Sequence, residues 1–162
     1  MKDKIVRVSI ESLRNEGLKF SLDLLANKLK ISKKTIYKFF SDKESLALAI
    51  YQKYYADAIE KAQTLVNSEA PSSRPELLHL YYDSKIMMRG DIFNKYKLNK
   101  SIYTYASEQN DILWEIVSAS FGEETNCGTE TLRIIIDGSF EKLCNARIDP
   151  DAVIERLVKL LW

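Results

Sequence analysis

The sequence is poor in residues that interrupt helices or build cross-linked scaffolds. Its 162 residues include 5 glycines, 3 prolines, 2 cysteines and 1 histidine. With so few breakers, we expect helix nearly throughout, and therefore an all-α fold. Because Cys127 and Cys144 are not clustered with each other or with the histidine, a disulfide framework and a zinc site are not expected. This thiol usage fits a reducing cytoplasm.

Long apolar runs are also missing. No segment approaches the roughly 20 consecutive apolar residues that a membrane-spanning helix needs. The first residues, MKDKIVRVSIESL, mix charges with apolar positions and do not resemble a secretion signal. A membrane partner is therefore not expected, and the 46% of apolar residues is available for a folded core.

Charge is distributed unevenly along the chain although its net value is only +1. Residues 1–50 hold 11 basic and 6 acidic side chains, whereas the remainder holds 13 basic and 17 acidic ones. A polyanion would be attracted to the first third and repelled by the rest. Uneven surface charge without function is the simpler alternative.

The helix pattern is clearest at the start of the chain. Apolar spacing predicts one helix over 2–16, a second after a cap at Ser21, and a third after a cap at Ser32 with Ile36, Phe39 and Phe40 on its buried side. Ser41 and Glu44 have the spacing of a capping box, which opens a long helix over 43–66. Further helices are predicted over 77–89, 91–99, 101–121, 130–146 and 150–162.

The second and third of these helices have the pattern of a DNA-binding helix-turn-helix. Between Ala26 and Ser41 the only charged residues are lysines, and the third helix presents them away from its apolar side. A cationic helix held by a small core suits the major groove, where side chains reach base edges and phosphates. An ordinary helical hairpin with solvated lysines remains the alternative. The candidate DNA-binding residues are Ser21, Ser32, Lys33, Lys34, Thr35, Tyr37, Lys38 and Lys43.

The same segment resembles the N-terminal signature of TetR-type (TetR/AcrR) transcriptional regulators, G-x-x-F-[ST]-x-x-x-[LI]-A-x-x-x-x-[VI]-S-x-x-T-[LI]-Y-x-[YF]-F-x-x-K-x-x-L. A weaker similarity to this family is the run from Ile135 to Gly138, IIDG. Lys30 and Lys34 depart from the family pattern, because each replaces a frequent glycine. The matching residues are Gly17, Phe20, Ser21, Leu25, Ala26, Ile31, Ser32, Thr35, Ile36, Tyr37, Phe39, Phe40, Lys43 and Leu46.

The resemblance implies a domain organisation and a partner. Residues 1–46 would form the helix-turn-helix domain, joined through the long helix to a helical domain over 47–162 that dimerises and holds a small effector. It implies a homodimer in which each subunit places the 32–40 helix in one major groove of a palindromic double-stranded operator.

Aromatic residues are concentrated in the second part of the chain. Eight of the nine tyrosines lie between Tyr51 and Tyr105, and tyrosine offers an apolar wall with a polar tip. They favour a pocket for a small organic effector, with packing inside a helical bundle as the alternative. The candidate pocket residues are Tyr54, His79, Tyr82, Phe93, Tyr103 and Trp114.

The last two helices each have a wide apolar stripe. Such a pair can meet its symmetry mate as a four-helix bundle, and the resemblance favours this dimer over packing within one subunit. The candidate interface residues are Leu132, Ile135, Ser139, Leu143, Ile154, Leu157, Val158 and Leu161.

The predicted function is that of a TetR-type regulator, specifically a repressor. Binding of a small effector would release the protein from DNA. An effector-blind dimer that binds DNA or docks a protein is the alternative. An enzyme is not expected, because the sequence has no Ser/His/Asp set, no phosphate-binding glycine loop and no metal-ligand pattern. No cofactor is expected beyond a possible effector.

Overall fold

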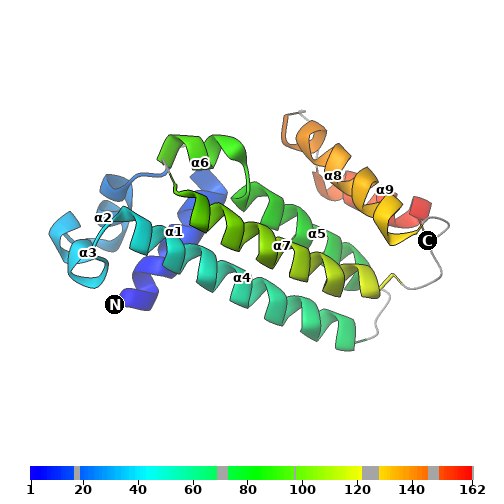
Figure 1. Cartoon of the computed structure of the whole chain (residues 1–162), viewed down its shortest axis with the longest axis horizontal. Coiled ribbons are helices and arrows are strands. Elements are labelled where there is room, and N and C mark those ends of the chain that lie inside the picture. Colours follow the sequence, from blue (N-terminus) through cyan, green and yellow to red (C-terminus); the bar gives the residue numbers. More distant parts are fainter. Residues whose placement is uncertain (17–18, 69–72, 97, 122–127, 146–149, 162) are drawn as a thin grey trace. The chain divides into compact units, whose positions relative to one another are not determined.

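All regular structure in the described part of the chain is α-helical (Figure 1). The computed structural model describes residues 1–16, 19–68, 73–96, 98–121, 128–145 and 150–161, except the side chains of 140–145, 150, 151 and 161. This confirms the predicted all-α fold. The helices are α1 (Lys2–Glu16), α2 (Leu22–Leu29), α3 (Lys33–Phe39), α4 (Lys43–Asn67), α5 (Ser73–Met87), α6 (Gly90–Tyr96), α7 (Lys100–Ala119), α8 (Thr129–Asn145) and α9 (Pro150–Leu161).

Within those ranges, no helix combines the length and the apolar character needed to cross a membrane.

The helices divide into two compact units. Unit 1 consists of residues 1–57 and 86–110, and unit 2 consists of residues 58–85 and 111–162, as far as these are described. Helices α4, α5 and α7 each contribute residues to both units. The boundary predicted between residues 46 and 47 was drawn by function, between a DNA-binding domain and a ligand-binding and dimerisation domain. It stays a prediction.

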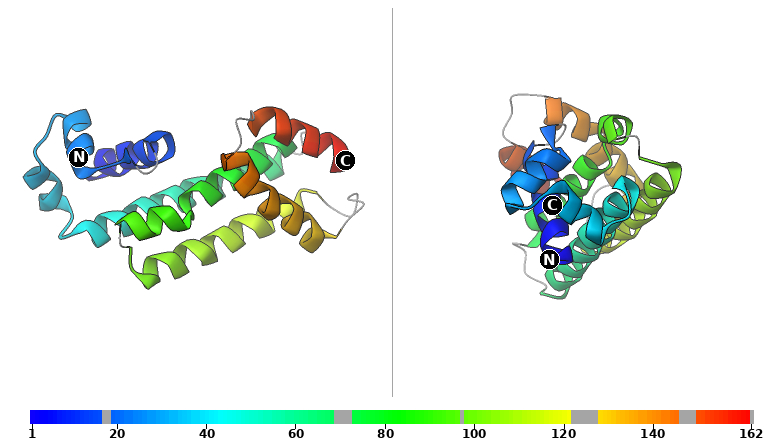
Figure 2. Two further views of the ribbon diagram at one scale, coloured as in Figure 1. Left: turned by 90° about the horizontal axis from the view of Figure 1, so that it is seen from above. Right: turned by 90° about the vertical axis from the view of Figure 1, so that its left-hand side faces the viewer.

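The first three helices pack around a small apolar core in unit 1. Helix α2 contacts both α1 and α3 (Figure 2). The side chains of Ile5, Leu25 and Ile36 are at most 1% exposed. Helical spacing predicts that α1 buries Ile5, Val8, Ser9, Ser12 and Leu13. The structure buries Val6 in place of Val8, which is only partly buried. A core of this kind fixes the orientation of α3, since its buried residue cannot turn outward without exposing apolar surface.

The turn between α2 and α3 contains a left-handed residue. Lys30 has φ 54° and ψ 42°, and its N–H donates to the carbonyls of Ala26 and Asn27. This closes α2 as a left-handed C-terminal cap, a position that favours glycine. Lys30, which replaces a frequent family glycine, therefore adopts the left-handed conformation with the strain that a side chain causes there.

The N-terminus of α4 is capped one residue later than the sequence predicts. The backbone N–H of Ser45 donates to Asp42 Oδ1 at 2.7 Å, and the backbone N–H of Asp42 donates to Ser45 Oγ at 3.2 Å. The predicted box of Ser41 and Glu44 is therefore wrong, and Asp42 with Ser45 forms the reciprocal pair. Asp42 is preferred because a carboxylate accepts from helix N–H groups more strongly than a hydroxyl does.

Asp42→Ala is expected to lower Tm by a few degrees at neutral pH, whereas Ser41→Ala is expected to change it much less. The hydrogen bond from the Ser45 N–H lowers the pKa of the Asp42 carboxyl below its ordinary value. Because the folded pKa is the lower one, this contribution is present above about pH 4 and is lost as pH falls through the folded pKa. Thermal melts of both variants between pH 7 and pH 2 test this. A larger effect of Ser41→Ala would restore the predicted box.

Helices α6 and α7 hold the helix-turn-helix segment from within unit 1. The Tyr96 hydroxyl of α6 donates to the carbonyl of Phe20 at 2.8 Å, and the two rings meet edge-on with centroids 6.0 Å apart. Asn99, just before α7, donates to Glu44 Oε2 of α4 at 3.0 Å. The chain is thus fixed both immediately before the cap of α2 and at the start of α4.

Candidate nucleic-acid interface

The orientation of α3 is set by its cap and by its buried side. Ser32 Oγ accepts from the backbone N–H of Thr35 at 3.1 Å, as predicted for the cap. Ile36 is 1% exposed, and Phe40, which follows the helix in an extended conformation, is 3% exposed. Because these two side chains are buried, the opposite side of α3 faces solvent.

Residues four apart lie above one another on a helix, so the outward surface of α3 has three rows. Lys34 and Lys38 form the middle row, opposite Ile36, and both are exposed. Lys33 and Tyr37 form one flanking row. Thr35 and Phe39 form the other. The middle row is the part best placed to enter a groove, because it is farthest from the core.

Lys33 has an acidic neighbour on α2. Its ammonium lies 2.7 Å from Asp23 Oδ1, with the two side chains 49% and 70% exposed. An ion pair this exposed is worth at most about 1 kcal/mol, so Lys33 can exchange the carboxylate for a phosphate at little cost. Asp23 is the only acid in α2 and α3, and the surface of the two helices is therefore cationic.

The eight predicted DNA-binding residues all belong to unit 1, on α3, its cap, the cap of α2 and the start of α4. Ser21 and Ser32 are exposed, and each hydroxyl accepts a backbone N–H as an N-cap. Thr35 is partly buried, with its Oγ1 2.9 Å from Ser32 Oγ. The others are exposed: Lys33, Lys34, Tyr37, Lys38 and Lys43.

Two residues of this surface were missed by the sequence reasoning. Phe39 was predicted to be buried but is 40% exposed, because Phe40 leaves the helix and occupies the core instead. Lys2, at the start of α1, has its ammonium 5.5 Å from the centre of the Phe40 ring, which adds a cation beside the end of α3. The excess of basic residues at the start of the chain was the available signal for Lys2.

The candidate effector residues divide between the two units. Tyr54 and Phe93 are buried in the core of unit 1, and Tyr103 is 48% exposed with its ring edge-on to Phe93. In unit 2, Tyr82 and Trp114 are each 6% exposed. The structure therefore uses four of the six as core residues.

Unit 2 has a surface depression of about 280 Å³ that includes one of the candidates. His79 lies there among side chains of both charges, and the other lining residues are Lys61, Glu76, Leu80 and Asp83. Among the described residues no group of three or more His, Cys, Asp or Glu side chains is placed to hold a metal ion.

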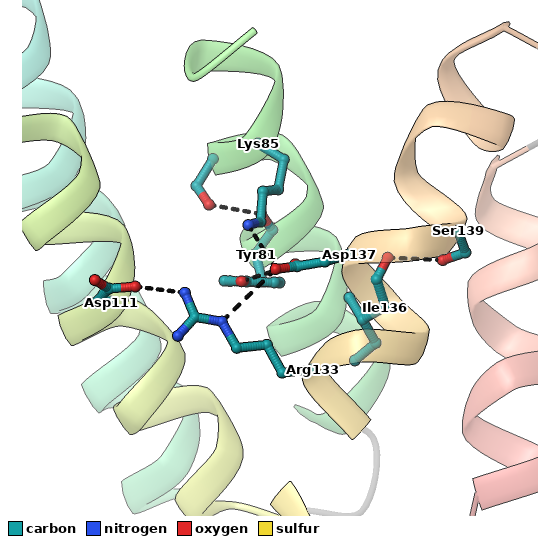
Figure 3. Close-up of polar contacts among 8 residues, drawn as sticks. Tyr81, Lys85, Asp111, Arg133, Ile136, Asp137 and Ser139 are labelled. Carbon is teal, nitrogen blue, oxygen red and sulfur yellow. Dashed lines mark hydrogen bonds and ion pairs between the residues drawn. The ribbon is translucent and has the colours of Figure 1, made fainter. Parts of the chain in front are cut away.

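A polar cluster in unit 2 holds α8 against α5 and α7 (Figure 3). Asp137 of α8 accepts from the Tyr81 hydroxyl at 3.0 Å and pairs with the Lys85 ammonium at 3.0 Å. Arg133, one turn earlier, pairs with Asp111 of α7, and its guanidinium lies 5.8 Å from the Trp114 ring. Burial raises the pKa of the Tyr81 hydroxyl, so it stays protonated and donates. The cluster fixes which side of α8 faces outward.

The outward side of α8 and α9 differs in part from the predicted interface. Leu132 and Ile154 are 0% and 1% exposed, so in this chain their side chains pack within the core of unit 2. Ser139 Oγ lies 2.6 Å from the Tyr82 hydroxyl.

Other residues of the predicted interface retain apolar surface. Ile135 is 39% exposed, and Leu157 and Val158 are partly exposed. The sequence reasoning missed two neighbours, Ile134 at 68% and Leu160 at 77% exposure. The side chains of Leu143 and Leu161 lie outside the described residues.

A short helix, a tight turn and a second helix with outward lysines form a helix-turn-helix motif. Residues 5–50 match the family model described as "Bacterial regulatory proteins, tetR family". The match confirms the resemblance of this segment to the N-terminal region of TetR-type regulators. No curated protein is significantly similar to the chain.

Solved structures extend the similarity of fold to the rest of the chain. One is a TetR transcription regulatory protein from Mycobacterium vanbaalenii, with 15% identity, coverage of 98% of this chain and 93% of that chain, and a TM-score of 0.64. Another is the ketosteroid transcriptional regulator KstR2 of Mycobacterium tuberculosis, with 13% identity, coverage of 98% and 91%, and a TM-score of 0.59. A third is the superantigen PfiT, with 13% identity, coverage of 99% and 95%, and a TM-score of 0.62. At these identities the similarity shows the fold alone. Two of the three proteins are named as transcription regulators and the third as a superantigen.

Proposed function

We propose that the protein is a transcriptional repressor that binds a palindromic operator as a homodimer and is released from DNA by a small effector. The observation that carries the DNA-binding part is the exposed row of Lys34 and Lys38 on a helix whose other side is locked into the core. The sense of regulation follows from the family resemblance. Phosphates would contact the lysines, and the serine caps would remain as helix supports.

The homodimer is supported by the apolar surface that α8 and α9 leave exposed. Ile134, Ile135 and Leu160 lie on the two helices predicted to pair with a second copy. Exposed apolar side chains of this size are stabilised by burial against an identical surface. In the proposed complex the two α3 helices occupy successive major grooves, about 34–36 Å apart.

Effector gating is proposed through α4. This helix begins at Lys43 beside the DNA-binding residues and contributes to both units, to unit 1 through Asp57 and to unit 2 from Ala58. A ligand that binds more tightly to one arrangement of the two α3 helices than to the other shifts the population toward it. Effector gating requires only this difference in affinity between the two arrangements.

An effector-blind dimer is a second candidate, and the packing of the aromatic residues favours it. Tyr54 meets the Tyr55 ring at 5.2 Å, Trp114 meets the Tyr81 ring at 4.9 Å, and the Tyr82 hydroxyl lies 2.6 Å from Ser139 Oγ. Side chains that fill a core are not available to line a ligand cavity. The two candidates differ in whether any compound both stabilises the protein and releases it from DNA.

Selection of duplexes from a random-sequence library with the whole chain tests the proposal. The expected product is a two-fold symmetric site that the chain also protects in a footprint on its own promoter. Compounds that raise Tm are then added to the complex. Release of the duplex by such a compound supports gating, and stabilisation without release supports the effector-blind dimer. Recovery of no preferred duplex would contradict the operator proposal itself.

A further inference from the structure

Phe39 is an exposed aromatic residue on the candidate DNA-binding surface. It is 40% exposed, whereas the other phenylalanines with described side chains, Phe20, Phe40, Phe93 and Phe121, are at most 8% exposed. Its neighbour Phe40 fills the core position that follows α3. The packing of unit 1 therefore leaves a substantial part of the Phe39 side chain in contact with solvent.

Phe39 shares its row on α3 with Thr35. The Thr35 hydroxyl is 2.9 Å from Ser32 Oγ, and either oxygen can be the donor of this hydrogen bond within the cap. We call this the apolar row, because it carries a methyl group one turn before an aromatic ring.

The apolar row runs beside the row of Lys34 and Lys38. Cations of the middle row attract the phosphates of a duplex and draw this side of α3 into the groove. The apolar row then faces base edges rather than solvent. In the major groove the one apolar group on a base edge is the 5-methyl group of thymine, and threonine methyl groups and phenylalanine rings are suited to contact it.

We propose that Phe39, with the Thr35 methyl group, contacts a thymine 5-methyl group and makes this protein select thymine at one position of each half-site. The inference rests on the proposed function, because it requires α3 to lie in a major groove. It assigns Phe39 a role in base recognition. The helical spacing of the sequence predicted a core role for this residue instead.

The test measures affinity for two duplexes. The first is the symmetric duplex selected by the wild-type chain. The second carries deoxyuridine in place of one thymine in each half-site, and one such duplex is made for each thymine position in turn. Deoxyuridine lacks only the 5-methyl group. Loss of one buried methyl contact is worth about a fourfold change per half-site, or about 15-fold for both. At one symmetric position, wild type is expected to bind the deoxyuridine duplex about 15-fold more weakly, and Phe39→Ala is expected to lose most of this difference.

Two further variants and the salt dependence separate this role from a structural one. Phe39→Leu keeps an apolar side chain and is expected to retain preference for thymine. Ile112→Ala, which truncates an apolar residue of 41% exposure in unit 2, is expected to bind both duplexes like wild type. The slope of affinity against salt is expected to be unchanged in Phe39→Ala, because no phosphate contact is lost.

The outcomes distinguish the inference from the proposed function. If Phe39→Ala binds as wild type does, or stays sensitive to deoxyuridine at every position where wild type is sensitive, the thymine contact is overturned while DNA binding stands. If Phe39→Ala binds DNA more weakly but keeps the wild-type sensitivity to deoxyuridine, the thymine contact is overturned as well. The Phe39 ring would then contact a deoxyribose sugar or another protein. If wild type selects no duplex, the proposed function and this inference fall together.

Discussion

Lys34→Ala and Lys38→Ala are each expected to weaken binding to the selected duplex by about 30-fold in the dimer. Each variant removes one contact per half-site, and each contact is worth on the order of 1 kcal/mol. The double variant removes four cations from the complex. If these contact phosphates, the plot of log affinity against log salt becomes shallower by about 4. Titrations at several salt concentrations measure both quantities.

Lys61→Ala is the matched control, because Lys61 is an exposed lysine of α4 in unit 2. It changes net charge as Lys34→Ala does, and its binding is expected to stay near that of wild type. Alanine favours helix, so neither replacement should unfold α3 or α4. Equal losses in Lys61→Ala and Lys34→Ala would indicate a general charge effect and would remove α3 as the DNA-binding helix.

Ile135→Glu is expected to convert the proposed dimer into a monomer and to weaken operator binding by about 10²–10⁴-fold. The carboxylate would be buried against a second copy without a partner, which is strongly unfavourable. A monomer then occupies one half-site and loses the gain from linking two binding events. Sedimentation gives the mass, and titration with the selected duplex gives the affinity.

Ile112→Glu provides a close comparison for this variant. Ile112 and Ile135 are both in unit 2 and are 41% and 39% exposed, so the two changes add the same charge at similar exposure. Ile112→Glu is expected to remain dimeric and to bind DNA. A dimer that survives Ile135→Glu would place the subunit contact elsewhere than the exposed side of α8.

Much of the helix-turn-helix segment could be predicted from the sequence because its determinants are local. Ser21 and Ser32 were predicted as caps, and each accepts a backbone N–H three residues ahead. Lys30 was noted as a replacement for a family glycine, and it has the left-handed conformation that favours glycine. Hydrogen bonds between a side chain and its own turn need only a few adjacent residues, so the sequence states them directly.

The cap of α4 shows where such local reasoning reaches a limit. Ser41 with Glu44 and Asp42 with Ser45 have the same spacing, and both pairs contain a residue that favours the cap position. Which pair forms depends on where the chain enters the helix, and that is set by Phe40 packing into the core just before it. The sequence pattern alone does not rank the two registers.

The sequence by itself determined that the chain is helical, that its start has TetR-type character and that α3 carries its lysines outward. These properties follow from residue type, periodicity and capping, which act over one or two helical turns. Tertiary structure alone decided that Phe40 rather than Phe39 fills the core, that Tyr82 and Trp114 are core residues, and that Leu132 is consumed within the subunit. The interior has room for only some of the apolar side chains. Which of them are buried depends on neighbours that are distant in the sequence.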